Sequence, residues 1–296
     1  MKKLLAILFA LCRVVPLQPK KVVLLRRFPQ WGSLGLLGDY LRENTDLRVV
    51  PIEHWRRLST IYHLATAGTL FLNDGFSPLA KFPFSQKARV VQLWHADGAL
   101  KRWGAAAGEP FPESHRYTHV ICATEAIVSH WAAAFGVAED KVLPLGSPTG
   151  DALMRAQRSD GVLSQVLYAP SLGEPVPLDL PNLHVRHHPK VQPEQESLED
   201  LLCRCCCVIT DISSVMVSAA ALDIPVILFA PDEAVFFDDI HARAPGAIVH
   251  TVDELMDELA APGDYSRERA AFAAHHLGVC DGGACARIAE ELFGEW

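Results

Sequence analysis

The sequence predicts an α/β protein with two doubly wound domains, each built on a parallel sheet with helices on both faces. Short apolar runs of strand length alternate with segments that have apolar residues at helical spacing. The runs are nearly continuous in apolar character, which is typical of parallel strands buried on both faces. The alternation occurs twice along the 296 residues, with a stretch of small and polar residues between the two halves.

The first half contains five predicted strands, at residues 21–25, 47–52, 69–72, 89–93 and 119–123. Residues 31–41 form a predicted helix that begins in a glycine-rich turn, and residues 125–135 form another that ends before Gly136. Gly32, Gly35 and Gly38 are three apart, unlike the GxGxxG spacing of dinucleotide sites. We therefore interpret these glycines as a loop-to-helix turn and not as a nucleotide site.

The composition shifts to small and polar residues at 146–162, and we place the domain boundary between residues 155 and 156. Predicted strands of the second half lie at 165–169, 183–186, 207–210, 226–229 and 248–250. Its predicted helices lie at 198–202, 214–222, 252–259, 266–275 and 284–293. Domains 1–155 and 156–296 are thus expected to be two Rossmann-like units facing a cleft. Ligands of such sheets bind beyond the carboxyl ends of the strands.

The formal charge of -8 argues against a general nucleic-acid binder. Residues 1–60 nevertheless carry eleven Lys or Arg against four Asp or Glu, a balance of +7, so residues 61–296 carry -15. A basic N-terminal part favours an anionic partner there, such as a membrane surface or a phosphorylated acceptor. The alternative is a solvated basic face with no partner.

The N-terminus begins like a secretory signal, with Lys2 and Lys3 before the apolar run 4–11. No small-residue cleavage site follows, and the run is shorter than the roughly 20 residues needed to span a bilayer. We interpret it as a short helix that lies in the membrane interface, with an uncleaved anchor as the alternative.

The eight cysteines include the run Cys205, Cys206 and Cys207, preceded by Cys203. Adjacent residues of a strand point to opposite faces, so these thiols cannot all reach one ion. Zinc sites use paired spacings such as CxxC, which the chain lacks. We therefore predict small buried residues leading into a strand, with no metal and no cofactor. Crowded unpaired thiols favour a reducing compartment.

Three polar groups follow predicted strands, where a ligand is expected. The first is His95, which a strand delivers into a loop and which can exchange a proton near neutral pH. A lone histidine is more often structural. The second is the cluster at 186–190, in which Arg186 and His188 can donate to a diphosphate. Its alternative is a solvated basic turn.

The third group is Asp211, Ser213 and Ser214, between a strand and an apolar helix. Hydroxyls and free backbone N–H groups at a helix N-terminus form an arrangement that binds phosphate. Ordinary capping of the helix by Ser213 or Ser214 is the alternative, and it is compatible with phosphate binding.

Together these motifs resemble the CDP-glycerol glycerophosphotransferase family, the teichoic-acid primases and polymerases. QLWHADGALKRWG is similar to that family's QTWHGTPLKKxG, LYAPS to LYAPT, and RHHP to RxHP. ITDISSVMVSAAALDIPVILF resembles ITDYSSVMFDxALLDKPIIFF, and APGAIVHTVDELMDEL resembles APGPIVKTxEEL. The resemblance runs through most of the chain from about residue 21. It implies a GT-B-like fold with the acceptor domain first and the donor domain second.

The resemblance also implies that an acceptor hydroxyl attacks the β-phosphorus of a CDP-alditol and that CMP leaves. It makes His95 the base, and His188 with Arg186 the groups that stabilise diphosphate charge. Asp211, Ser213 and Ser214 would hold the donor phosphates or ribose.

Ala96 and Asp97 replace the family's Gly and Thr, and Gly98 replaces its Pro. Asp97 is therefore a possible acceptor-side residue. Ile212 replaces an aromatic residue of the family pattern, which removes any stacking at that position.

The expected partners are CDP-glycerol or CDP-ribitol, a lipid-linked acceptor and the membrane surface, with no nucleic acid. The expected location is the cytoplasm, peripherally on the inner face of the cell membrane. Two alternatives stay open at this point. One is a GT-B glycosyltransferase that uses a sugar nucleotide, and the other is a degenerate module that binds a nucleotide without catalysis.

Overall fold

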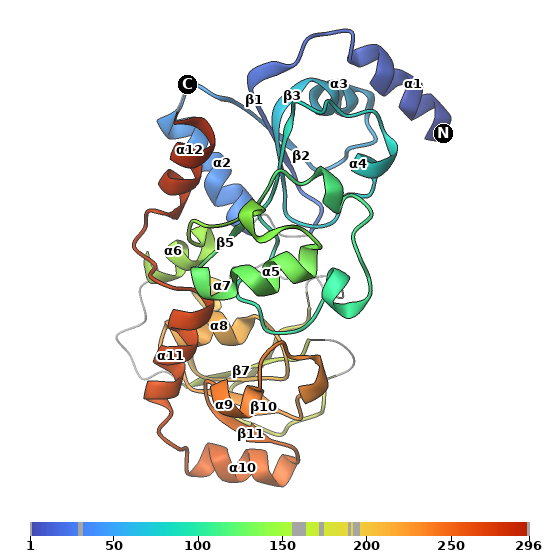
Figure 1. Ribbon diagram of the computed structural model, residues 1–296. Coiled ribbons are helices and arrows are strands. Elements are labelled where there is room, and N and C mark those ends of the chain that lie inside the picture. The colour runs from blue at the N-terminus through green and yellow to red at the C-terminus, as the bar shows by residue number, and fades with distance from the viewer. Residues whose placement is uncertain are drawn as a thin grey trace. The chain divides into compact units, whose positions relative to one another are not determined.

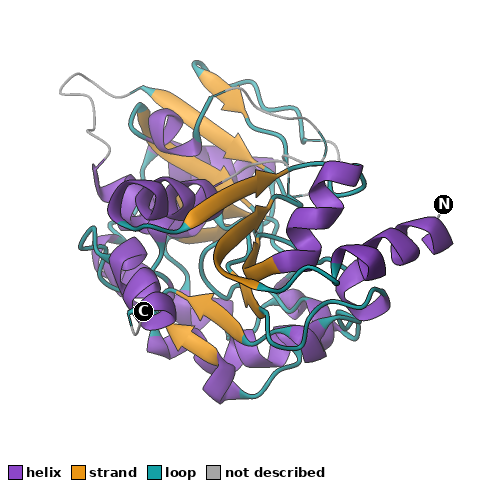
Figure 2. Ribbon diagram, turned by 90° about the horizontal axis from the view of Figure 1, so that it is seen from above, coloured by secondary structure: helices purple, strands orange, loops and turns teal. Residues whose placement is uncertain are grey.

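The structure, a computed structural model, describes residues 2–28, 32–155, 164–171, 175–188, 191 and 196–294. The chain divides into two compact units. The first comprises Met1–His95, Trp103–Pro148 and Ala284–Trp296, and the second comprises Ala96–Arg102 and Thr149–Gly283. Each unit holds a parallel sheet with helices packed against it (Figures 1 and 2).

Strands of the first unit pair in the order β2-β1-β3-β4-β5-β6, and neighbouring strands are parallel. They are β1 (Gln18–Leu25), β2 (Arg48–Ile52), β3 (Ala67–Leu72), β4 (Arg89–Gln92), β5 (His119–Cys122) and β6 (Val142–Pro144). The helices are α1 (Lys2–Cys12), α2 (Gly32–Asn44), α3 (Leu58–Thr66), α4 (Pro78–Lys81), α5 (Val128–Phe135) and α12 (Ala284–Phe293). The five predicted strands are all present. β6 was not predicted, because only the first of its three residues is buried.

The core of the first unit lies between the sheet and helices α2 and α12. Leu34, Leu37 and Leu41 of α2 are fully buried against strand residues such as Val22 and Leu24. Gly38 permits this close approach, since a Cβ there would lie 2.3 Å from a Leu24 methyl carbon. Helix α2 therefore packs closely on β1 at Gly38, because this residue has no side chain.

The last helix, α12, belongs to the first unit, although the sequence placed residues 284–293 in the second domain. Ile288 and Leu292 are buried in the same cluster as α2. Burial of these two side chains stabilises the docking by roughly 3–6 kcal/mol before entropy losses. The units divide between Pro148 and Thr149, at the start of helix α6 (Pro148–Arg155). This point lies within the predicted boundary segment 146–162, but before the predicted boundary between residues 155 and 156. Residues 156–163 of that segment lie outside the described residues.

The N-terminal helix α1 packs against the first unit by one side. Leu5 and Phe9 are buried, and the Phe9 ring lies 4.4 Å from that of Phe84. Ile7 and Leu11, in contrast, are 57% and 62% exposed. No helix within the described residues is long and apolar enough to cross a membrane.

Strands of the second unit pair in parallel in the order β11-β10-β9-β7-β8. They are β7 (Gln165–Ala169), β8 (Leu183–Val185), β9 (Cys205–Thr210), β10 (Val226–Phe229) and β11 (Ala247–Val249). The helices are α7 (Leu198–Leu202), α8 (Val215–Ala221), α9 (Ile240–Arg243), α10 (Val252–Ala260) and α11 (Ser266–His276). All five predicted strands of this half are present.

Both sheets have the same topology over their first five strands. In each sheet, the second strand in the chain pairs with one side of the first strand, and the third strand pairs with its other side. The direction in which strands are added therefore switches between β1 and β3 in the first sheet, and between β7 and β9 in the second. In open parallel sheets, ligands bind at the carboxyl ends of the strands beside such a switch point. The loops after β1, β3 and β4, and after β7, β8 and β9, are therefore the places to examine.

Candidate active site

His95 follows β4 and is the last residue of this part of the first unit. Its Nδ1 lies 3.0 Å from the backbone carbonyl oxygen of Asn73, which follows β3. A carbonyl only accepts hydrogen bonds, so Nδ1 must carry the proton that is donated. The neutral ring therefore has its lone pair on Nε2, and Nε2 is the nitrogen that can take a proton from a substrate.

The backbone just before His95 is held in an unusual conformation. Trp94 has φ of +61°, in the left-handed region that non-glycine residues occupy at a cost of order 1–3 kcal/mol. Its N–H donates to the Oε1 of Gln92 at 3.0 Å, and Gln92 is fully buried. The amide of Gln92 also lies 3.4 Å from the hydroxyl of Tyr117, whose pKa is raised by burial. A buried polar chain thus supports the turn that presents His95.

Asn73 is a site residue that the sequence analysis missed. Its side chain is buried, and its Oδ1 accepts from the N–H groups of Arg27 and Phe28 at 2.7 and 3.1 Å. The same residue holds His95 through its carbonyl, so it joins the loops after β1, β3 and β4. Its signal in the sequence is a polar residue directly after the apolar strand β3, beside the switch point.

Asp97 belongs to the second unit, with the segment Ala96–Arg102. Its Oδ2 accepts from the hydroxyl of Thr149 at 2.7 Å. The same segment is tied further by the Lys101–Phe236 bridge and by the bond from the Phe237 N–H to the Leu100 carbonyl. The predicted acceptor-side role of Asp97 stays a prediction, and the structure gives it a structural partner at the start of α6.

The second group of predicted residues lies at the switch point between β7 and β9. Asp211 follows β9, and its carboxylate accepts from the Ser171 N–H at 2.9 and 3.1 Å and from the Ser171 hydroxyl at 2.6 Å. The N–H of Ile212 donates to it at 2.5 Å. Asp211 therefore fixes the loop after β7, and Ser171 is a buried residue to which the sequence analysis gave no role.

Arg186 and His188 follow β8, the strand on the other side of β7. Arg186 is only 5% exposed, and its guanidinium donates to the carbonyl of Glu196 at 3.4 Å. His188 is half-buried, and its carbonyl accepts from the Val191 N–H at 2.8 Å. The predicted neighbours Pro189 and Lys190 lie outside the described residues. Of Arg186 and His188, His188 is the more accessible.

Ser213 and Ser214 stand before α8, which has seven residues and begins at Val215. The hydroxyl of Ser213 accepts from the Val215 N–H at 3.4 Å, a weak capping contact. Ser214 is the N-cap residue but makes no side-chain cap bond. Both are half-buried. Because β8 and β9 flank β7, the loops of His188 and Ser213 follow strands that are about 10 Å apart at one edge of the sheet.

We expect Asp211→Ala to loosen the second unit, because it leaves the buried N–H and hydroxyl of Ser171 without this partner. The loss of unfolding free energy should be about 1–3 kcal/mol. Hydrogen exchange of peptides covering β7 and β9 should become faster. Ser213→Ala, which removes only the weak contact to Val215, is the control and should exchange like the natural protein. Equal exchange in Asp211→Ala would show that the carboxylate does not hold this loop.

The cysteine run lies on and before β9. Cys205 and Cys207 are buried, and the Cys206 thiol donates to the Gln165 carbonyl at 3.4 Å. Burial raises the pKa of Cys207 to about 12, so its thiol stays protonated at neutral pH. All eight cysteines are free thiols. The run therefore contributes small apolar side chains to the sheet.

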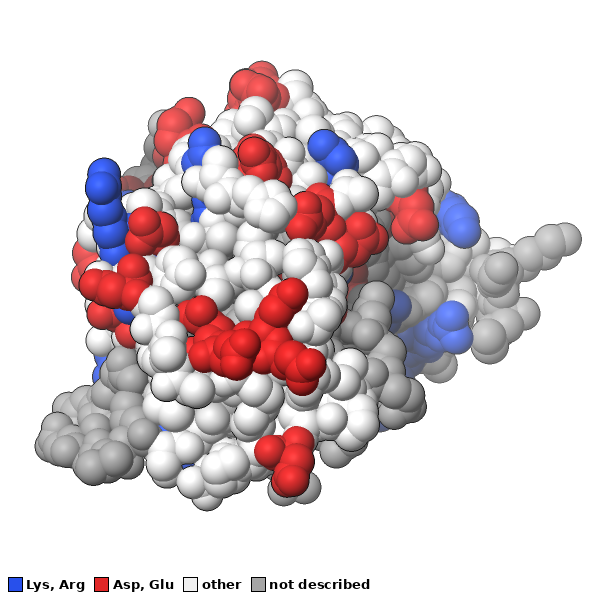
Figure 3. Space-filling model, turned by 90° about the horizontal axis from the view of Figure 1, so that it is seen from below, with Lys and Arg blue, Asp and Glu red and all other residues white. Residues whose placement is uncertain are grey.

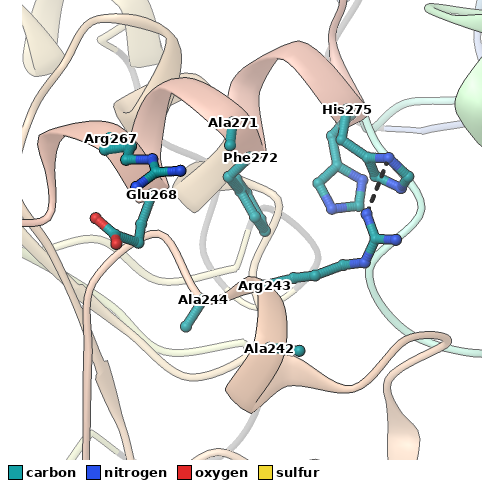
Figure 4. Close-up of a pocket in the computed structure, with 9 residues that line it drawn as sticks. Ala242, Arg243, Ala244, Arg267, Glu268, Ala271, Phe272 and His275 are labelled. Carbon is teal, nitrogen blue, oxygen red and sulfur yellow. Dashed lines mark hydrogen bonds between the residues drawn. The ribbon is translucent and has the colours of Figure 1, made fainter.

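A cavity of about 480 Å³ lies in the second unit beside α9 and α11 (Figure 4). Its lining consists of Ala242, Arg243, Ala244, Arg267, Glu268, Ala271, Phe272, His275 and His276. A guanidinium nitrogen of Arg243 donates to Nδ1 of His275 at 3.2 Å. The volume is in the range of small-molecule sites. None of the seven predicted site residues lines it, so it is distinct from the strand-end groups.

Residues 41–171 and 185–294 match the family of CDP-glycerol:poly(glycerophosphate) glycerophosphotransferases. The chain belongs to this family. The matched segments contain both strand-end groups, His95 in the first segment and His188 with Asp211 in the second. The resemblance seen in the sequence motifs is thereby confirmed.

Relatives of this glycerophosphotransferase family member act in teichoic acid synthesis. The teichoic acid ribitol-phosphate primase of Bacillus spizizenii is 27% identical, with 95% of this chain and 92% of the primase covered. The teichoic acid glycerol-phosphate primase of Bacillus subtilis is 21% identical, with 71% and 69% covered. These names do not decide between glycerol and ribitol.

Two solved structures show the fold. A variant of the wall teichoic acid polymerase TagF with CDPG superimposes with a TM-score of 0.78 at 16% identity, covering 98% of this chain and 93% of TagF. UDP-GlcNAc 2-epimerase from Neisseria meningitidis has a TM-score of 0.56 at 12% identity, covering 93% and 100%. The glycerophosphotransferase chain therefore has the predicted two-domain, GT-B-like fold.

The turn after His95 contains Gly98 in the left-handed region of backbone conformation. Gly98 has φ of +78°, and a Cβ there would lie 3.0 Å from the Val217 side chain and 3.3 Å from His276. The family pattern has proline at this position, and proline is locked near φ of -65°. Gly98 therefore has a backbone conformation that a proline could not adopt.

Proposed function

We propose that the protein transfers glycerol phosphate, or a related alditol phosphate such as ribitol phosphate, from its CDP derivative to a hydroxyl of a membrane-associated acceptor. CMP is the second product. The proposal is carried by the geometry at His95 in a chain of this family. A carbonyl fixes the proton on Nδ1 and leaves Nε2 to act as a base.

In the proposed reaction, Nε2 of His95 takes the proton of the acceptor hydroxyl as its oxygen attacks the β-phosphorus. A new P–O bond forms, and the bond between the β-phosphorus and the bridging oxygen breaks. The electron pair of that bond leaves with CMP, which gains negative charge. His95 is then an imidazolium that returns its proton to solvent. General bases contribute typically about 10²–10⁴-fold to such steps.

We assign the donor diphosphate to the carboxyl edge of the second sheet. His188 and the hydroxyls of Ser213 and Ser214 follow strands on either side of β7, within the span of a nucleoside diphosphate by strand spacing. In this proposal, Asp211 holds the loop of Ser171, which follows β7, the strand between β8 and β9. Arg186 follows the same strand as His188 and is 5% exposed, and in this proposal it contributes positive potential to the diphosphate site.

The decisive experiment is to incubate the protein with CDP-glycerol, CDP-ribitol and UDP-sugars, each with lipid-linked acceptors that end in a sugar or an alditol phosphate. We expect CMP release with a CDP-alditol that depends on the acceptor. UDP release with a sugar nucleotide would instead indicate a glycosyltransferase. Tight binding of a CDP-alditol without CMP release on any acceptor would indicate a non-catalytic module.

We further propose that α1 places the enzyme on the inner face of the cell membrane. The helix uses Leu5 and Phe9 to pack onto the first unit, while Ile7, Leu11 and Val14 are mainly exposed. Lys2, Lys3 and Arg13 are neighbours of these residues in the sequence, and basic residues beside exposed apolar ones suit an anionic lipid surface. Acidic side chains gather on the face shown in Figure 3.

The double variant Ile7→Ser, Leu11→Ser tests this membrane contact without touching Leu5 or Phe9. Each exposed aliphatic residue that enters the bilayer contributes about 1.5–3 kcal/mol, so binding to anionic liposomes should fall at least about tenfold. Co-sedimentation with phosphatidylglycerol vesicles measures this. Val279→Ser is the matched control, because Val279 is 82% exposed in the second unit. Equal binding by the double variant and the control would rule out this surface.

A further inference from the structure

His95 is part of a continuous row of aromatic rings within the first unit. The rings of Phe28 and His95 are parallel within 2°, with centroids 3.8 Å apart. The Trp94 ring lies 4.1 Å from that of His95 at 34°, and the Trp103 ring lies 4.5 Å from that of Trp94 at 8°. The order of the row is Phe28, His95, Trp94 and Trp103.

The two rings beside His95 occupy opposite faces of the imidazole. Centroids 3.8 and 4.1 Å from one small ring cannot share a face of it without overlapping each other. Phe28 is only 4% exposed, whereas His95, Trp94 and Trp103 are half-buried. The imidazole is therefore covered on both faces, and its edge is the part that can meet a substrate.

Three further contacts hold this row in place. The Phe28 N–H donates to Oδ1 of Asn73, and Nδ1 of His95 donates to the backbone carbonyl of Asn73, so Asn73 anchors both rings. Gln92 holds the Trp94 N–H in the left-handed conformation that turns this ring onto His95. Phe135 contacts Trp94 and Trp103 edge-on, at 5.5 and 4.6 Å. Each side of the row is thus fixed independently of His95.

We propose that Phe28 and Trp94 are positioning residues for His95, and that they clamp the imidazole so that Nε2 keeps one orientation toward the acceptor hydroxyl. The inference rests on the proposed role of His95 as the base. With both faces covered and Nδ1 bound to the Asn73 carbonyl, the ring cannot turn over without breaking that bond. An aromatic face also favours the imidazolium that forms during proton transfer, because its quadrupole attracts a cation.

The test compares Phe28→Leu and Trp94→Leu with Phe28→Tyr in the CMP-release assay with CDP-glycerol and the lipid-linked acceptors above. Misplacement of a catalytic group by about 1 Å costs up to about 100-fold, so we expect kcat of the leucine variants to fall about 10- to 100-fold. KM for CDP-glycerol should not change. Phe28→Tyr, which keeps the aromatic face, should keep most of the activity.

A spectroscopic signature separates positioning from general loss of structure. Aromatic faces above and below a ring move the NMR signals of its carbon-bound protons upfield, and each leucine variant should reduce that shift for His95. Phe293→Leu is the matched control, because Phe293 is a buried phenylalanine of the same unit whose ring contact is to Phe71. It should leave both kcat and the His95 signals unchanged. Should Phe28→Leu not fold, Trp94→Leu makes the same test from the other face.

The outcomes distinguish the two proposals. If His95→Ala is inactive while Phe28→Leu and Trp94→Leu match the Phe293→Leu control, the clamp is wrong and the base stands. If His95→Ala keeps near-normal turnover, the role of His95 as base is wrong, and the clamp has no catalytic function. A parallel loss of kcat and of the upfield shift supports the clamp.

Discussion

Replacing His95 with alanine is expected to lower kcat for CMP release by about 10²–10⁴-fold, the usual contribution of a positioned general base. Binding of CDP-glycerol should be nearly unchanged. The reason is that His95 lies in the first unit and is proposed to act on the acceptor hydroxyl, whereas the donor is assigned to the second unit. Steady-state kinetics and calorimetric titration with CDP-glycerol measure the two quantities separately.

His54→Ala is the control for this experiment, because His54 is an exposed histidine of the same unit that follows β2. It should retain full turnover. A second comparison uses free imidazole, which should restore part of the activity of His95→Ala if a base is what has been lost. Near-normal turnover of His95→Ala without imidazole would remove His95 from the mechanism.

The strands were predictable because parallel strands buried on both faces must be apolar throughout. Residues 22–25 of β1 and residues 70–72 of β3 are buried, and both runs are apolar in the sequence. Strand β6 was not predicted, because it is short and only one of its three residues is buried. Helix α6 escaped because its residues are small and polar at the start, although Pro148 and Asp151 are typical of a first helical turn.

The division into units was less predictable, since an amphipathic pattern shows that a helix has a buried face but not what covers it. The pattern of 284–293 predicted a helix with an apolar side. That side packs on the first sheet, to which the chain returns after completing the second. Likewise, nothing in the residues Ala96–Arg102 shows that they leave the first unit directly after His95.

At the candidate site, the sequence located the strand ends but not the bonds among them. His95 and Asp211 were found because each follows an apolar strand. The partner of His95 is a backbone carbonyl of Asn73, and a carbonyl leaves no mark in a sequence. The sequence did not show that the Asp211 carboxylate accepts from Ser171, which is 40 positions away in the chain. The predicted role of Asp211 in holding the donor stays a prediction. The sequence did not show that Arg186 is buried, and its predicted place at the diphosphate stays a prediction.

His188→Ala is expected to lower kcat by about 10²–10³-fold, the usual loss when one preorganised donor to a developing charge is removed. The diphosphate already carries negative charge when the donor binds, so part of the interaction exists in the ground state. As the bridging bond breaks, the leaving CMP gains further charge, and a donor near it becomes more important in the transition state. Turnover should therefore fall more than affinity, and Kd for CDP-glycerol should rise by no more than about threefold.

His187→Ala is the matched control, because His187 is the adjacent residue and is also half-buried. Successive residues of an extended chain point to opposite sides, so the neighbour should not reach the same phosphate. Ser213→Ala and Ser214→Ala should show the opposite balance: Kd for CDP-glycerol should rise by a larger factor than kcat falls. If Kd for His188→Ala rises as much as kcat falls, His188 binds the donor equally in both states and does not stabilise the leaving group. If His187→Ala reproduces the whole effect, the loop after β8 acts through its fold and not through the His188 ring.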